Sequence, residues 1–492
     1  MENKGMLAER RPVHHGLSET SHGKFKIIFC LISLAALFIC AGAQENTTDY
    51  WMKKATEFRY RGSFEESAQA YDKALQIDPE NATIWISKAL DLGSIGKENE
   101  SLKAYETALR LTEETLKNHP QDARAWHRKG QILSNLGREE EALQAFEKAL
   151  ATSNQIIEND QKNASVLRVK AEALVNLGRW GESLQTLDKV IEIDPKNYDV
   201  IGRKGELLMM MGRFNESLEA LDRATQLIPA NDTLELVTYW SAKSEVLQSA
   251  ERLEEAIAAL DKVTDLDPQN AAAWRIKGFL LEGLGRNNDS LAAFEEAIKI
   301  DPEDAHSWST KAGLLSMMKM YDESLQAYDR ALELTPANDT TRLAETWLLK
   351  GDALNKTGRQ EEALQAYQSS VENIDKTLQN DSNNTAAWSQ KGRALLKLSR
   401  YDEALKAYEQ AIETATAEVS LHFPDAWIGK GDALRALGKN GEALEAYDKA
   451  IDINPIFGNA WHGKGEAERA LGKVYNASMS FYVAQKLGYE WG

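Results

Sequence analysis

Residues 427–455 read WIGKGDALRALGKNGEALEAYDKAIDINP, and this stretch decides how most of the chain folds. Its apolar residues recur three and four positions apart on both sides of the glycine-rich segment 438–441, which predicts two amphipathic helices joined by a tight turn. Pro455 ends the second helix, because proline lacks an amide hydrogen and disfavours helix in the residue before it. In an antiparallel hairpin, Gly431 would lie opposite Tyr447 and leave room for its ring.

The same pattern occurs twelve times, at spacings of 34 to 41 residues. Four residues after the position of Trp427 the side chain is always small, sixteen after it stands Ala or Ser, and twenty after it stands an aromatic residue or leucine. This recurrence predicts the same packing in every repeat. The position of Trp427 is occupied in turn by Trp51, Trp85, Trp126, Leu167, Ile201, Trp240, Trp274, Trp308, Trp347, Trp388, Trp427 and Trp461.

The pattern resembles the tetratricopeptide repeat family, whose 34-residue unit carries a Trp, a small residue, an A-x3-F element and a terminal Pro. The matching residues are Trp427, Gly431, Ala443, Tyr447 and Pro455. The resemblance covers residues 49 to about 486. It implies an all-α, right-handed superhelical solenoid of about twelve antiparallel helix hairpins, with repeats that start near residues 48, 82, 123, 164, 198, 237, 271, 305, 344, 385, 424 and 458.

Composition allows one long domain and excludes some partners. A repeat solenoid grows by adding units, so residues 44–492 are expected to form a single solenoid, with residues 485–492 covering its last repeat. The formal net charge of −18 disfavours binding to nucleic-acid phosphates. The two cysteines, Cys30 and Cys40, both precede the repeats, so the repeats contain no disulfide and no zinc site.

The N-terminal segment 1–43 reads as an export signal or a membrane anchor. Its first 26 residues are polar with several basic side chains, and residues 27–43 are apolar and end in Ala41-Gly42-Ala43. These three parts are typical of a secretory signal peptide, although the apolar run is also just long enough to span a bilayer as a transmembrane helix. In both cases the basic residues before the run place the repeats outside the cytoplasm, as a secreted or cell-surface protein.

Glycosylation sequons point to the same location. Twelve asparagines begin N-x-[ST] sequons, and most fall in turns inside or between repeats. Asparagine also suits turns and helix caps, which explains the asparagine but not the Ser or Thr two residues later. The candidate N-glycosylation sites of a surface glycoprotein are Asn46, Asn81, Asn99, Asn163, Asn215, Asn231, Asn288, Asn338, Asn355, Asn380, Asn383 and Asn476.

Lysine stands three residues after the Trp position in all twelve repeats, where the family usually has leucine. An acidic residue follows eighteen positions later in ten of them, which predicts an ion pair within each repeat. The alternative is a basic stripe that awaits an acidic ligand. This structural lysine ladder comprises Lys54, Lys88, Lys129, Lys170, Lys204, Lys243, Lys277, Lys311, Lys350, Lys391, Lys430 and Lys464.

The sequence carries no catalytic, metal or cofactor motif. The eight histidines form no H-E-x-x-H spacing, and His127 and His462, which follow the Trp position, are expected on the exposed helix surface. Paired carboxylates begin second helices, where the helix dipole favours them. We therefore expect no enzyme activity and no cofactor.

The remaining means of action is binding. The resemblance implies that the first helix of each repeat lines a concave wall, here with residues such as Glu206, Glu245, Asp352 and Asp432. The prediction is a non-catalytic scaffold for a protein or extended peptide of unknown identity. Two alternatives remain open at this point: a structural component of the cell envelope that assembles through its own ends, and a non-catalytic carbohydrate or small-molecule binder.

Overall fold

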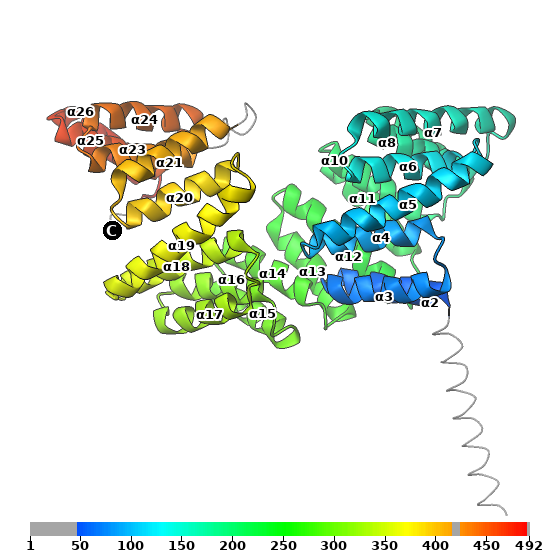
Figure 1. The fold of residues 1–492 in the computed structure, drawn as a ribbon, viewed down its shortest axis with the longest axis horizontal. Coiled ribbons are helices and arrows are strands. Elements are labelled where there is room, and N and C mark those ends of the chain that lie inside the picture. Colours follow the sequence, from blue (N-terminus) through cyan, green and yellow to red (C-terminus); the bar gives the residue numbers. More distant parts are fainter. Residues whose placement is uncertain (1–46, 416–423, 490–492) are drawn as a thin grey trace, which may run out of the picture. The chain divides into compact units, whose positions relative to one another are not determined.

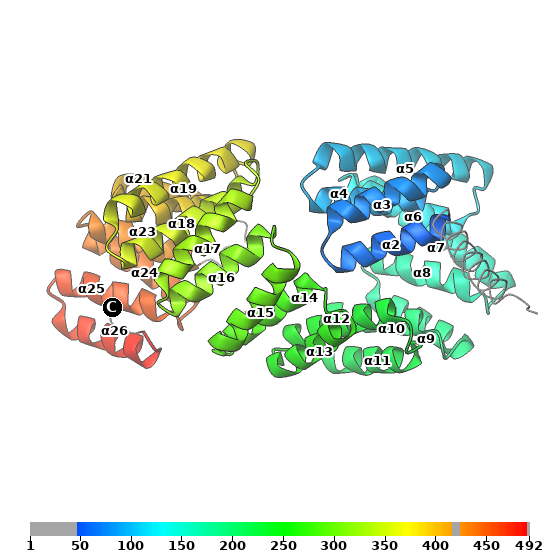
Figure 2. The ribbon, with the colours of Figure 1, turned by 90° about the horizontal axis from the view of Figure 1, so that it is seen from below.

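Every regular element is a helix in the computed structural model, which describes residues 47–415 and 424–489. The predicted signal or anchor segment 1–43 and Asn46 lie outside the described residues. The described part contains 24 α-helices and no strand, which confirms the predicted all-α class (Figure 1). Consecutive helices pair as hairpins, and the two helices of a pair lie side by side in both views (Figure 2).

The helices divide into two compact units at the boundary between Ala242 and Lys243, which falls inside α12. The first unit holds α2 (Thr48–Tyr60), α3 (Phe64–Ile77), α4 (Ala82–Ser94), α5 (Glu98–Asn118), α6 (Ala123–Asn135), α7 (Glu139–Asn159), α8 (Ala164–Asn176), α9 (Trp180–Ile193), α10 (Tyr198–Met210), α11 (Phe214–Leu227) and the start of α12 (Thr233–Ser249).

The second unit continues from the end of α12 with α13 (Leu253–Leu266), α14 (Ala271–Gly283), α15 (Asn287–Ile300), α16 (Ala305–Met317), α17 (Tyr321–Leu334), α18 (Thr340–Lys356), α19 (Gln360–Asn380), α20 (Thr385–Lys397), α21 (Tyr401–Thr414), α23 (Pro424–Ala436), α24 (Asn440–Ile453), α25 (Gly458–Ala470) and α26 (Val474–Lys486). Even-numbered helices up to α20, followed by α23 and α25, are the first helices of their repeats.

The core of each hairpin joins a small residue on the first helix to a large one on the second. A Cβ atom built on Gly431 would lie 2.7 Å from Cε1 of Tyr447, which confirms the expected pairing. The serine sixteen residues after the Trp position adds a bond that the sequence did not reveal. Its hydroxyl donates to a first-helix carbonyl, as Ser324 does to Ala312 at 2.7 Å and Ser290 to Gly278 at 2.8 Å.

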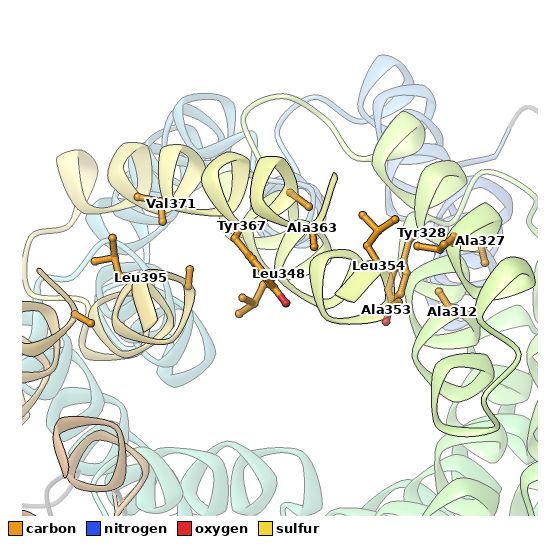
Figure 3. Packing of buried hydrophobic residues seen from close by; sticks show 14 of the residues in the cluster. Ala312, Ala327, Tyr328, Leu348, Ala353, Leu354, Ala363, Tyr367, Val371 and Leu395 are labelled. Carbon is orange, nitrogen blue, oxygen red and sulfur yellow. The ribbon is translucent and has the colours of Figure 1, made fainter. Parts of the chain in front are cut away.

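Neighbouring hairpins share these cores. One buried cluster joins Ala312 and Tyr328 of one repeat to Leu348 and Tyr367 of the next, and continues to Leu395 (Figure 3). Tyr447 likewise lies against Gly431 of its own repeat and Gly463 of the following one, so a repeat depends on its neighbours for burial of its apolar face.

Repeats longer than 34 residues take up the extra length in helices. The second helices α5, α7 and α19 have 21 residues instead of 14, so their apolar faces stay in phase for two more turns. The first helices α12 and α18 begin early and have 17 residues. The extra turn of α18 contributes to the candidate site described below.

Candidate functional site

The lysine ladder joins neighbouring repeats, so the prediction of an ion pair within each repeat is wrong. Lys464 pairs with Asp448 of the preceding repeat at 2.5 Å, and Lys311 with Glu295 at 2.9 Å. The reason is geometric, because the lysine on a first helix faces the second helix that precedes it in the chain. The other pairs of this kind are Lys88–Asp72, Lys129–Glu113, Lys204–Asp188, Lys277–Asp261, Lys350–Asp329, Lys391–Asp375 and Lys430–Glu409.

The long second helices shift the acidic partner by two helical turns. Lys129 pairs with Glu113 and Lys391 with Asp375. Counted from the Trp position of its own repeat, each of these acids lies seven residues later than the acid of a 34-residue repeat. The corresponding residue for Lys170 is Asn154, which carries no charge. In the described part of the chain Lys170 forms no ion pair, and burial, with a contribution from Lys189, lowers the pKa of its ammonium group.

Eight ladder lysines also lie over the tryptophan three residues before them: Lys88, Lys129, Lys277, Lys311, Lys350, Lys391, Lys430 and Lys464. The distances from Nζ to the ring centroid are 4.8 Å for Lys277 over Trp274 and 5.4 Å for Lys464 over Trp461. A cation over an indole face is attracted by the ring quadrupole. A lysine at this position makes two contacts that the family's usual leucine cannot make, an ion pair with the preceding repeat and a cation–π contact with the tryptophan. These lysines are paired, so they do not form a basic stripe that awaits an acidic ligand. Lys54, at the first repeat, pairs with Glu57 of its own helix.

The sequon asparagines lie where a sugar could reach them. Asn81 and Asn163 are half-buried and cap α4 and α8, where their side chains accept from the amides of Thr83 and Val166. The other nine described sequon asparagines are exposed: Asn99, Asn215, Asn231, Asn288, Asn338, Asn355, Asn380, Asn383 and Asn476.

In the first unit the first helices α6, α8 and α10 line a cavity of about 290 Å³. His127, Glu172, Arg203, Glu206 and Met210 are among its lining residues. Glu206 was expected on this wall from the sequence. His127 was expected to be exposed and is instead 5% exposed, because the position after the Trp turns into the gap between neighbouring first helices. Its position after the Trp had predicted exposure, and no other feature of the sequence indicated its burial.

The hydrogen bond between Asn176 and His127 fixes the tautomer of the ring. Nδ2 of Asn176 lies 3.2 Å from Nε2 of His127, and an amide nitrogen can only donate, so Nε2 accepts. The ring hydrogen is then on Nδ1, which lies 3.6 Å from a carboxylate oxygen of Glu172. Burial, together with the nearby Arg203 and Arg128, lowers the pKa of His127 to about 4, so the ring is neutral at pH 7.

Glu172 carries the charge next to His127 in the lining of this cavity. Burial raises the pKa of its carboxyl group, and the guanidinium groups of Arg203 and Arg168 oppose that shift. Arg203 Nε is 3.8 Å from Glu172 and 3.7 Å from Asp199, beyond hydrogen-bond range. The cavity thus offers closely spaced donors and acceptors of both charge signs, a lining suited to polar groups of a ligand.

A larger cavity of about 650 Å³ lies in the second unit between α14, α16 and α18. Phe279 and Met317 give it exposed apolar surface, being 40% and 59% exposed. Its carboxylates are Glu282, Asp339, Glu345 and Asp352, and its only guanidinium among the described residues is Arg342. His306, also in the lining, has its pKa lowered by burial and by Arg275. The lining is therefore strongly acidic.

Asp352, expected on the concave wall, is held by three partners. The hydroxyl of Tyr367 donates to it at 2.9 Å, Arg393 at 3.0 Å, and the Lys397 ammonium lies 3.2 Å away. Asp432 of a later repeat accepts from the hydroxyl of Tyr447 at 2.7 Å. Burial raises the pKa of both phenols, and the neighbouring aspartate adds to that effect, so both hydroxyls remain protonated.

Neither cavity assembles a metal centre. Within residues 47–415 and 424–489, no three His, Cys, Asp or Glu side chains converge in a way that could hold a metal ion. Of the helices in these same ranges, none has the length and apolar character needed to cross a membrane.

Comparisons with known proteins agree on the repeat type. Models of the tetratricopeptide repeat match residues 80–155, 174–233, 242–305, 303–376 and 389–455, and a TPR repeat model matches residues 55–90. Together these segments cover well over half of the chain. No curated protein matches it in sequence.

Solved structures with similar helical architecture have low sequence identity. A tetratricopeptide repeat protein from Parabacteroides merdae is 18% identical, with a TM-score of 0.41 over 52% of this chain and 94% of that one. Yeast Tom70 is 13% identical, with a TM-score of 0.41 over 90% and 99% of the two chains. The APC/C hetero-tetramer Cut9–Hcn1 gives 14% identity and a TM-score of 0.40 over 89% and 93%.

Proposed function

Because this chain belongs to the tetratricopeptide repeat family, we propose that it is a non-catalytic scaffold that binds an extended segment of a protein partner along its first helices. The observation that carries this proposal is the location of the two cavities. Both are lined mainly by first helices, α6, α8 and α10 in one unit and α14, α16 and α18 in the other.

The distribution of side chains explains why first helices present the free surface. The aromatic residues of the second helices are buried in the hairpin cores, as Tyr328 and Tyr447 are at 1% and 0% exposure. On the first helices, Met210 and Met317 are about half exposed and lie in the cavities. Flexible methionine side chains suit contact with an irregular peptide surface.

The proposal includes a location outside the cytoplasm. The sequon asparagines that the structure describes are exposed or half-exposed, which permits glycosylation at all of them. The basic and then apolar start of the chain is typical of export. Mass spectrometry of the N-terminus and of the sequon peptides from the native protein tests this part, and unmodified sequons with an intact N-terminal segment would contradict it.

Site-specific photo-crosslinking tests the scaffold proposal. A photoreactive amino acid at Met210 or Met317 is expected to capture a defined partner from the native extract. The matched controls are Leu143 and Leu364, which are 46% and 47% exposed on the second helices α7 and α19. Equal capture at all four positions, or capture only at the two leucines, would contradict binding along the first helices.

Assembly through the chain's own ends is a second candidate because the last helix leaves apolar side chains uncovered. On α26, Val474, Tyr475 and Tyr482 are 69%, 78% and 54% exposed. Tyr489, the last described residue, stacks on His462 of α25 instead, with ring centroids 4.6 Å apart. Light scattering separates the candidates, since end-to-end polymers support assembly and a stable monomer supports the scaffold.

A further inference from the structure

Tyr328 has a hydroxyl group without a hydrogen-bond partner among the described residues, although the residue is only 1% exposed. Its oxygen is not one of the fully enclosed unpaired atoms of the described residues, so the hydroxyl is open to the cavity and can bind a group placed there. Tyr328 lines the cavity of the second unit. Burial, together with Asp352 and Glu345, raises the pKa of its phenol, so the group keeps its hydrogen.

Two equivalent tyrosines show what is missing at Tyr328. Tyr367 and Tyr447 each donate to an aspartate that lies fifteen residues earlier, on the first helix of the same repeat. The residue fifteen positions before Tyr328 is Gly313, which has no side chain to accept the bond. A Cβ atom built on Gly313 would meet only the Tyr328 hydroxyl, at 3.8 Å.

Other repeats support this comparison. Tyr71 and Tyr408 also lack such a hydrogen bond, and the residues fifteen positions before them are Thr56 and Arg393 rather than an acid. Neither of these tyrosines lines the cavity, whereas the missing side chain of Gly313 opens a space directly in front of Tyr328. The cavity therefore contains an unfilled position for a polar group.

The charge around this position selects the kind of group. Beside Tyr367 the next first helix supplies a cation, Arg393, whereas at the equivalent place beside Tyr328 it supplies Asp352, so that helix provides no cation there for an incoming carboxylate. Glu282 and Glu345 also line the cavity, and in the described part of the chain neither forms an ion pair. The two unpaired carboxylates of Glu282 and Glu345 therefore favour a positively charged ligand. Phe279 presents a partly exposed ring on which a planar guanidinium could stack.

We infer that the cavity at Gly313 and Tyr328 binds a basic side chain of a partner polypeptide, with arginine as its best ligand. The cation lies between Glu282, Glu345 and the phenol oxygen of Tyr328, and the Tyr328 hydrogen is donated to a carbonyl oxygen of the same segment. This inference rests on the proposed function, because the ligand is a residue of a protein partner.

Titration of the full chain with short peptides tests the inference. The probe is the capped pentapeptide Gly-Ser-Arg-Ser-Gly, and the matched peptides carry Lys, Gln or Glu at the centre. Dissociation constants are measured by NMR at low salt. We expect the arginine peptide to bind most tightly, the lysine peptide to follow within about fivefold, and the glutamine peptide to bind about tenfold more weakly, because a charge-assisted hydrogen bond contributes more than a neutral one. Equal binding of the glutamine or glutamate peptide would overturn the inference, and so would no binding of any peptide.

Substitutions then locate the binding. Gly313→Asn supplies an internal acceptor to Tyr328 and fills the space, so it should weaken the arginine peptide about tenfold, while Gly313→Ala leaves the affinity within about twofold. Tyr328→Phe should weaken it about fivefold without lowering the Tm, because Phe294 occupies the same position in the preceding repeat. Tyr447→Phe is the control: it should lower the Tm and leave the affinity unchanged. An unchanged affinity in Gly313→Asn would overturn the inference.

Failure of the peptide-binding inference can be distinguished from failure of the scaffold proposal. If Met317 captures a partner but no arginine peptide binds, the inference fails and the scaffold stands. If the arginine peptide binds at Tyr328 but no position captures a partner, the site stands as a receptor for basic groups and the scaffold fails.

Discussion

At the turn inside each hairpin, a single residue adopts a left-handed backbone conformation. Gly438 has φ of 75° there, and the equivalent residues Glu251, Lys319 and Ser399 have φ of 58°, 63° and 55°. A residue with a Cβ atom is strained in this region, whereas glycine is not. These three turns are therefore less favourable than the glycine turns of the other repeats.

We predict that Lys319→Gly and Ser399→Gly each stabilise the protein by about 1 kcal/mol, because the left-handed strain is removed. Thermal and urea unfolding of the full chain measure the effect. Gly438→Ala is the matched control and should destabilise by a similar amount. A lower Tm in both glycine variants would show that the turns are not strained.

Buried His127 predicts a local pH dependence. The folded pKa of about 4 lies below the ordinary value of about 6.5, so the unfolded chain binds more protons between these pH values. The contribution of the neutral ring to stability is fully present above about pH 6.5 and is lost as the pH falls through about 4.

The measurement is an NMR titration of the His127 ring, which should not titrate above about pH 5 in the folded protein. The chain unfolded in urea provides the reference and should titrate near 6.5. A folded-state midpoint near that reference would show that the ring is not buried beside Arg203.

Between helices, the ladder lysines connect one repeat to the preceding one rather than stabilise a single hairpin. Lys311 pairs with Glu295 of the preceding repeat, while Asp329 of its own repeat pairs with Lys350. The acidic partners are about half exposed, so each pair contributes little energy, and its benefit is the alignment of adjacent helices.

Double-mutant cycles distinguish the two arrangements. We predict a coupling of about 0.5 kcal/mol between Lys311→Gln and Glu295→Gln, because exposed pairs fall in this range. The cycle of Lys311→Gln with Asp329→Asn is the control and should show no coupling. The reverse result would restore the pairing within a repeat.

For the whole molecule, contacts run from each repeat to its neighbours, so damage should stay local. Gly431→Val would force methyl groups into Tyr447, since even a Cβ atom would lie 2.7 Å from the ring. We predict that hydrogen exchange accelerates in α23–α26 while α2–α11 keep their protection. Gly441→Ala is the control, because a Cβ atom there meets nothing within 4 Å. Uniform loss of protection across the chain would contradict a stack of semi-independent repeats.

The sequence predicted the hairpin and its small-to-large contact because both depend on residues within one repeat. Gly431 and Tyr447 are such a pair. The sequence did not predict the correct ion-pair partner of Lys311. Glu295 and Asp329 both have a suitable spacing, and only the packing of neighbouring repeats decides between them. The seven-residue lengthening of α5 could have indicated Glu113 as the partner of Lys129. The cavity beside Gly313 was missed because an absent side chain gives no signal until the equivalent positions Asp352 and Asp432 are seen to accept hydrogen bonds.

The central claim is that the molecule acts through the exposed faces of its first helices. The most direct test is the affinity of the partner captured by crosslinking for four charge variants of the full chain. Met210→Glu and Met317→Glu alter the cavities, and Leu143→Glu and Leu364→Glu alter similarly exposed positions on second helices. The account predicts that the methionine variants bind about tenfold more weakly and that the leucine variants stay within about twofold, because a charge is buried only at the interface. Loss of affinity in the leucine variants alone would contradict it.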